Sequence, residues 1–303
     1  MPLNPAARAG LDIISAPGVP PLDELPVTDA RIAYQQLAGL AGGPVPVART
    51  EDASADGVPV KLYWPEGAAP HPVLIWIHGG GWVLGSAAEA DALARDQCAR
   101  AGCLVVSVDY RLAPEHRFPA AVEDVVTVAK WVTANVESLG GDPTRLAVAG
   151  DSAGANLAAV LANELPGTFR LQVLIYPPTD LTLSHPSIQE NADGYLLTKD
   201  AVHYFTAQYL GDADPRNPLA SPLHAADATL AGSAPALVIT AEFDPLRDEG
   251  EAYVVRLRAC GVPVEHHRYD GMIHAFYAMG AMIPAAGDAA QQVAAALRSA
   301  YAG

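Results

Sequence analysis

Residues 146–164 read LAVAGDSAGANLAAVLANE, and this stretch decides the fold. Its first four residues form a short apolar run of the kind found in buried strands. From Ser152 onward the composition is rich in Ala and Leu, which favours a helix that ends before Pro166-Gly167. The two runs meet at Gly150-Asp151-Ser152-Ala153-Gly154, a G-x-S-x-G motif. The stretch therefore predicts a strand, a tight turn that carries Ser152, and a helix.

Strands and helices continue to alternate on both sides of this motif. Further apolar or alternating runs typical of strands lie at Val58–Trp64, Val73–Ile77, Leu104–Val108, Leu171–Tyr176, Ala236–Thr240 and Val264–Tyr269. Helical patterns lie at Ala87–Ala101, after Pro119, between the last two strands and near Ala289–Tyr301. This alternation predicts an α/β fold that begins near residue 58, with a mostly parallel central sheet flanked by helices.

Two segments interrupt the alternation. Residues 1–45 precede the first predicted strand and include a helical pattern around Thr28–Ala41. Residues 178–234 are rich in Pro and Asp and contain a helical patch at Thr198–Leu210, with Thr198 as its N-cap. A connection this long in a compact domain is usually a lid or an inserted subdomain. We therefore expect one domain over residues 1–303 that carries a cap.

Composition restricts the class of protein. The chain of 303 residues is 50% hydrophobic and 17% charged, which excludes a disordered protein. Its net charge of −16 argues against nucleic-acid or anionic-membrane partners. The N-terminus lacks the pattern of a signal peptide, no apolar stretch is long enough to span a bilayer, and the three cysteines cannot complete a disulfide framework. We expect a soluble, cytoplasmic protein.

A second motif, His78-Gly79-Gly80-Gly81-Trp82, directly follows the predicted strand at Val73–Ile77. Glycines allow a loop to turn its backbone amides toward a bound oxygen without interference from side chains. A tetrahedral intermediate of acyl transfer needs such amides for its negatively charged oxygen. We therefore expect the amides of Gly79, Gly80 and Ala153 to form an oxyanion hole.

An acid and a base follow in the chain order that a serine nucleophile requires on such a sheet. Asp244 comes just after the strand at Ala236–Thr240, and His274 comes just after the strand at Val264–Tyr269. Ligand crevices form at the carboxyl ends of parallel strands. We expect Ser152 to be the nucleophile, His274 the base and Asp244 the orienting acid. Asp248 is an alternative acid, although it lies further into the following helix.

These motifs together resemble the hormone-sensitive-lipase-like esterases, the group IV bacterial lipolytic enzymes of the α/β-hydrolase superfamily. The resemblance covers about residues 58–280 and is strongest with the branch that has Gly-Asp-Ser-Ala-Gly at the nucleophile. It is carried by His78-Gly79-Gly80-Gly81, Asp109-Tyr110-Arg111-Leu112-Ala113-Pro114-Glu115-His116, Gly150-Asp151-Ser152-Ala153-Gly154, Asp244-Pro245-Leu246-Arg247-Asp248 and His274-Ala275-Phe276. The family often has His-Gly-Phe where this chain has His-Ala-Phe.

The resemblance implies a helical cap over the C-terminal strand ends, built from about 1–45 and 178–225. The candidate walls of the substrate pocket are Trp82, Tyr195, Tyr204 and Phe205. Related enzymes often pair through the last edge strand, here Val264–Tyr269, so a homodimer through this strand is an expectation. The Tyr110–His116 block has an expected structural role, in which Arg111 reaches nearby carboxylates and cis bonds before Pro114 and Pro119 fix the loop.

The predicted reaction is hydrolysis of short- to medium-chain carboxylic esters through an acyl-enzyme on Ser152. It needs no cofactor and no metal, and the sequence has no HxxEH-type motif or paired Cys/His cluster. Two alternatives stay open. An amidase, an arylformamidase or a peptidase would use the same groups on the same scaffold. A small-ligand receptor of this fold would bind its ligand without hydrolysing it. Such receptors have a broken triad, whereas Ser152, Asp244 and His274 are all present in this chain.

Overall fold

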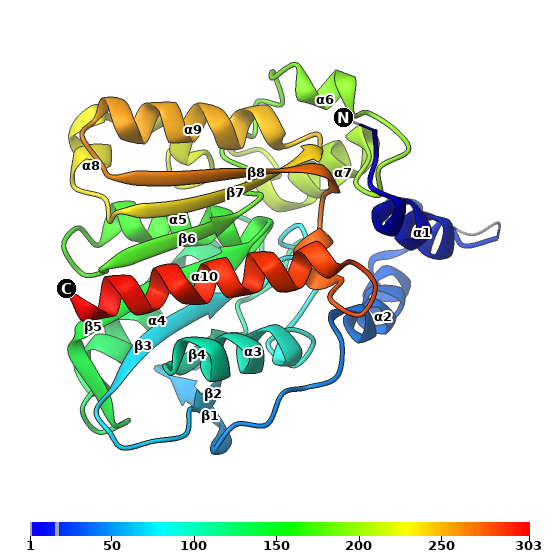
Figure 1. The fold of residues 1–303 in the computed structure, drawn as a ribbon. Coiled ribbons are helices and arrows are strands. Elements are labelled where there is room, and N and C mark those ends of the chain that lie inside the picture. The colour runs from blue at the N-terminus through cyan, green and yellow to red at the C-terminus, as the bar shows by residue number, and fades with distance from the viewer. Residues whose placement is uncertain (1, 16–17) are drawn as a thin grey trace.

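A computed structural model describes residues 2–15 and 18–303 as helices packed around a single eight-stranded sheet (Figure 1). The strand order is β1-β2-β4-β3-β5-β6-β7-β8, in which β2 runs antiparallel to β1 and β4 and all other neighbours are parallel. The strands are β1 Arg49–Ala55, β2 Val58–Trp64, β3 His71–Ile77, β4 Leu104–Val108, β5 Gly141–Asp151, β6 Leu171–Ile175, β7 Ala236–Phe243 and β8 Val264–Ile273.

Helices cover both faces of the sheet, as the alternation predicts. α3 Asp91–Ala101 and α10 Pro284–Ala302 pack on one face (Figure 1). The other face is covered by α4 Ala120–Asn135, α5 Ala153–Glu164, α8 Asp227–Ala231 and α9 Arg247–Ala259. In β3, Val73 and Ile75 pack into one core while Leu74 and Trp76 pack into the other. This alternation of side chains buries both faces of the strand, which explains its continuous apolar sequence.

The predicted start of the sheet near residue 58 is wrong, because β1 precedes it. This edge strand is mostly polar and exposed, so it lacks the apolar pattern of a buried strand. It joins β2 through Asp56 and Gly57, whose φ angles of 49° and 99° are those of a tight hairpin turn. The Asp-Gly pair is the signal by which the hairpin could have been found.

The remaining helices gather at the edge where the parallel strands end (Figure 1). They are α1 Pro5–Ile14, α2 Val27–Leu37, α6 Ser187–Glu190 and α7 Lys199–Leu210, with short 3-10 turns at Leu22–Glu24, Ala38–Ala41, Pro222–His224 and Phe276–Ala278. The helices expected around residues 28–41 and 198–210 are present, and the Thr198 hydroxyl caps α7 by accepting the Ala201 amide at 3.0 Å. α1 was not predicted. Within residues 2–15 and 18–303, no helix has the length and apolarity needed to span a bilayer.

Candidate active site

Ser152 stands at the turn between β5 and α5. Its φ of 53° and ψ of −124° are rarely adopted by residues with side chains, and its amide donates to the Ile175 carbonyl at 2.8 Å. The flanking glycines permit this turn, since a Cβ on Gly150 would lie 2.4 Å from the Gly154 backbone and one on Gly154 would lie 2.0 Å from the Ile77 carbonyl oxygen. The motif thus presents the Ser152 hydroxyl at the carboxyl edge of the sheet.

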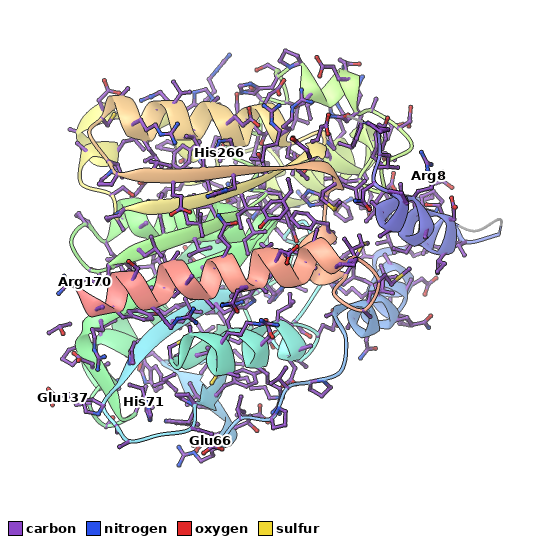
Figure 2. The ribbon with its side chains drawn as sticks, viewed as in Figure 1. Arg8, Glu66, His71, Glu137, Arg170 and His266 are labelled. Carbon is purple, nitrogen blue, oxygen red and sulfur yellow. The ribbon has the colours of Figure 1, made fainter. Side chains whose placement is uncertain are left out.

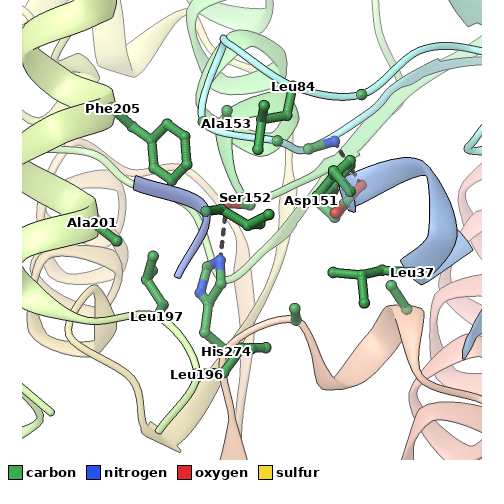
Figure 3. A pocket seen from close by; sticks show the side chains of 18 of the residues that line it. Leu37, Leu84, Asp151, Ser152, Ala153, Leu196, Leu197, Ala201, Phe205 and His274 are labelled. Atoms are coloured by element: carbon green, nitrogen blue, oxygen red, sulfur yellow. Dashed lines mark hydrogen bonds between the residues drawn. The ribbon is translucent and has the colours of Figure 1, made fainter. Parts of the chain in front are cut away.

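His274 and Asp244 form a chain of hydrogen bonds with this hydroxyl. Ser152 Oγ is 2.9 Å from His274 Nε2, and His274 Nδ1 is 2.7 Å from Asp244 Oδ2. The first of these contacts is drawn in Figure 3. His274 and Asp244 are buried, and the Tyr176 ring packs against the imidazole at a centroid distance of 4.6 Å. An imidazole between a hydroxyl and a buried carboxylate is arranged to take a proton from that hydroxyl.

The structure separates the two candidate acids. Asp248 Oδ2 accepts the amide of Ser187 at 2.9 Å, so this carboxylate ties α6 to the start of α9. Asp244 Oδ2 faces His274, while its Oδ1 accepts the Leu246 amide at 2.8 Å. The hydrogen bond to its own loop fixes the Asp244 carboxylate toward the imidazole, and Asp248 takes a structural position instead.

The glycine loop after β3 differs from its predicted arrangement in one residue. The Gly79 amide donates to Asp151 Oδ1 at 3.1 Å, so the structure does not support Gly79 as an oxyanion donor. Gly80 has a φ of 116°, and a Cβ there would lie 2.2 Å from the Leu84 carbonyl oxygen. In the described part of the chain, the amides of Gly80 and Ala153 donate to no other group. These two amides are therefore available to a bound oxygen.

Asp151 forms part of the floor beside the nucleophile. It is 7% exposed, and burial raises the pKa of its carboxyl group to about 6 against the opposing effects of the Gly79 amide and His274. Water would stabilise the charged form of a carboxyl group, and this site offers little of it. The charge on Asp151 therefore changes near pH 6.

The chain is similar to known proteins over most of its length. A family model described as alpha/beta hydrolase fold matches residues 74–278. The chain belongs to this family. Carboxylesterase NlhH of Mycobacterium tuberculosis (strain ATCC 25618 / H37Rv) is 41% identical over 298 residues, which cover 92% of this chain and 93% of that protein. Ethyl acetate hydrolase of Pseudomonas putida is 38% identical, with 98% and 99% covered.

Solved structures agree with this assignment. A hyperthermophilic esterase from the archaeon Pyrobaculum calidifontis superposes on this α/β-hydrolase with a TM-score of 0.91, at 40% identity and 99% coverage of both chains. The predicted fold and family resemblance are confirmed, and so is the predicted enzyme class, a carboxylic ester hydrolase.

In this α/β-hydrolase a cavity of about 550 Å³ opens above Ser152 and His274. α2 and α7 contribute side chains to opposite walls. Figure 3 shows Leu37 of α2 on one side of the serine and Phe205 of α7 on the other. A space of this size lies within the range typical of small-molecule sites.

Two of the four predicted pocket residues line this cavity, namely Trp82 and Phe205. Tyr195 and Tyr204 do not, which corrects the prediction. The Tyr195 ring stacks on Phe243 at 4.8 Å, and the Tyr204 ring packs edge-on against Phe205 at 5.4 Å. Both tyrosine rings therefore pack against neighbouring aromatic side chains.

Three lining residues that sequence reasoning missed are Tyr34, Leu37 and Glu89. The first two lie on α2, and Glu89 lies just before α3. No local motif marks them, because they meet the nucleophile only through tertiary packing. Within residues 2–15 and 18–303, no group of three or more His, Cys, Asp or Glu side chains is placed to hold a metal ion.

Arg31 fastens α2 onto the loops around the site. Its guanidinium donates to both carboxylate oxygens of Glu115, at 2.9 and 2.7 Å. It also donates to the backbone carbonyls of Val83 and Ala113, at 2.9 and 3.0 Å. A planar group with several donors suits such a junction. The position of the α2 wall therefore depends on this side chain.

The expected structural role of the Tyr110–His116 block agrees with its contacts. The Arg111 side chain donates to Asp124 Oδ1 at 2.9 Å, and the Arg111 amide donates to Asp124 Oδ2 at 2.8 Å. The Ala113-Pro114 and Phe118-Pro119 peptide bonds are both cis, as expected. The Tyr110 hydroxyl donates to the His78 carbonyl at 3.0 Å, which links this block to the glycine loop.

Proposed function

We propose that Ser152, His274 and Asp244 carry out ester hydrolysis in two acyl-transfer steps. The observation that carries the proposal is the continuous hydrogen-bond chain from Ser152 Oγ through the imidazole to the buried Asp244 carboxylate. His274 takes the serine proton as Oγ attacks the ester carbonyl, and it returns that proton to the departing alkoxide. Asp244 orients the ring and stabilises its positive charge.

The oxyanion is received by the free amides of Gly80 and Ala153. The amide of Gly81, the next glycine of the loop, is a further candidate, because Gly81 lines the cavity with a φ of 60°. Ala153 is the first residue of α5, so its amide belongs to the unpaired N-terminal turn of a helix. Water then attacks the acyl-enzyme with His274 again acting as base, which restores Ser152 and releases the carboxylic acid.

Short and medium acyl chains fit the cavity. Its volume of about 550 Å³ has to hold both halves of the ester. This favours soluble esters with acyl chains of roughly two to eight carbons over emulsified triglycerides. Rates for p-nitrophenyl esters of increasing chain length, measured beside Ser152→Ala, test the proposal. We expect a maximum at short chains and no turnover by the variant, while a rate that jumps above the solubility limit of a triglyceride would contradict it.

We also propose a cytoplasmic location and a homodimer through β8. Cys98, Cys103 and Cys260 are free thiols, and a reducing compartment keeps thiols in that state. β8 is the last strand of the sheet, so one of its edges pairs with no other strand of the described chain and can add a strand from a second copy. Cell fractionation and sedimentation equilibrium test the two proposals, and a purely monomeric protein would contradict the second.

A further inference from the structure

The cavity has two chemically different sides, which Figure 3 shows to either side of Ser152. Toward α7 the wall is mostly apolar and includes Leu197, Ala201 and Phe205. Toward α2 the wall includes Asp151 beside Leu37. An ester bound at the serine places its acyl part and its alcohol part in different directions, so one part faces each kind of wall.

Every lining residue with a formal charge at neutral pH is acidic. Among the described residues of the cavity wall these are Asp23, Glu89 and Asp151, and neither Lys nor Arg is among them. Glu89, Asp151 and Tyr34 of α2 all line the cavity. Burial, followed by the negative charges of Asp151 and Glu89, raises the pKa of the Tyr34 hydroxyl. The two carboxylates therefore both act electrostatically on the α2 wall of the cavity.

One of these two carboxylates has a buried oxygen without a hydrogen-bond partner. Asp151 is nine-tenths buried, and in the described chain Gly79 is the only other residue that donates to it, at Oδ1. Glu89 Oε2 is buried and has no hydrogen-bond partner. A buried carboxylate oxygen without a donor costs free energy, which a bound donor would recover. The α2 side is thus complementary to a positively charged donor.

We propose that the α2 side of the cavity binds a cationic, hydrogen-bond-donating group of the substrate. The preferred substrates are then esters that carry a protonated amine, and esters with a carboxylate in its place are poor substrates. This inference rests on the proposed hydrolysis at Ser152. Its physical basis is the attraction of a cation to Glu89 and Asp151 in a partly water-excluded space, where charges are less screened than in bulk water.

Esters of matched shape and different charge test the proposal. In one series the charge lies in the alcohol: dimethylaminoethyl, isoamyl and carboxyethyl butyrate. In the other it lies in the acid: ethyl esters of γ-(dimethylamino)butyric, isoheptanoic and glutaric acids. The tertiary amine is protonated near neutral pH, supplies one N–H donor and cannot accept an acyl group to give a stable amide. The series that shows charge selectivity also shows which half of the ester faces α2.

We expect the wild type to favour the amine over its neutral isostere by about five- to ten-fold in kcat/KM in one series, and to disfavour the carboxylate by at least as much. Glu89→Gln should lower the amine-to-neutral ratio by about three-fold or more, because the neutral amide removes one negative charge from the cavity wall. Glu137→Gln is the matched control, because Glu137 is exposed and lies at the edge of the molecule opposite α1 and α2 (Figure 2). It should leave all ratios unchanged.

The outcomes separate this inference from the proposed function. Suppose that the wild type hydrolyses the neutral esters and Ser152→Ala does not, but that all three charges give equal rates in both series. This result would overturn the inference and leave the proposed function intact. Failure to hydrolyse any ester would overturn both. If Glu89→Gln does not fold, the wild-type ratios still test whether the cavity prefers a cationic substrate. Glu89→Ser supplies a second variant, in which the amine-to-neutral ratio should also fall. A ratio that survives in both folded variants would contradict the assignment to Glu89.

Discussion

Replacing Asp151 by asparagine should change how the stability of the protein depends on pH. Burial raises the pKa of this carboxyl group from 3.8 to about 6. Because the pKa is higher in the folded state than in the unfolded chain, the neutral form stabilises the fold. That contribution is fully present below about pH 4 and is lost as the pH rises through about 6. A shift of this size corresponds to about 3 kcal/mol.

The Asp151→Asn variant would keep a side-chain oxygen that can accept the Gly79 amide, but its amide group does not ionise. The variant should therefore gain unfolding free energy relative to the wild type on going from about pH 4 to about pH 8, by about 3 kcal/mol. Urea unfolding of both proteins across this range measures the difference, and the other titrating groups cancel between them. A difference that is independent of pH, or that is larger at acid pH, would refute the reasoning.

Substitutions at three other positions should lower activity, and one of them should also lower stability. Asp244→Asn should lower kcat by about three to four orders of magnitude with little change in KM, because the imidazole loses its orienting charge; steady-state kinetics would contradict this if kcat fell less than about ten-fold. Arg31→Ala leaves two backbone carbonyls without their donor, so KM should rise and the unfolding free energy should fall by about 2 kcal/mol in urea titration. An unchanged KM would show that α2 does not shape the cavity. Gly81→Ala places a Cβ 2.6 Å from Phe205 Cγ and should lower kcat/KM, and adding Phe205→Ala should recover part of that loss. Additive losses in this double-mutant cycle would rule out the contact.

The sequence predicts that Ser152, Asp244 and His274 meet, because each follows a predicted strand, and hydrogen bonds join the three side chains in the structure. Parallel strands bring their carboxyl ends to one edge, so chain order alone predicts that these three side chains meet. The same reasoning predicted α2 and α7 approximately, from their helical patterns. It missed β1, whose exposed face offers no apolar signal.

The errors concern contacts between distant segments. The direction of the Gly79 amide depends on Asp151, a carboxylate from another strand, and the glycine motif alone does not show that the amide is already used. As aromatic residues of the predicted cap, Tyr195 and Tyr204 fit the pattern of pocket walls, but aromatic side chains are equally suited to packing, which is what both do. Tyr34 and Glu89 come from separate segments and both line the cavity only through tertiary packing, so no local pattern could have paired them.

The central claim is that Ser152 forms a covalent acyl-enzyme, and trapping that intermediate tests it most directly. The wild type is mixed with excess p-nitrophenyl butyrate, quenched in acid during the first turnover, digested and examined by mass spectrometry. We predict one butyryl group per chain, located on Ser152, and none in Ser152→Ala. A butyryl group on another residue, or turnover that continues in Ser152→Ala, would contradict the account.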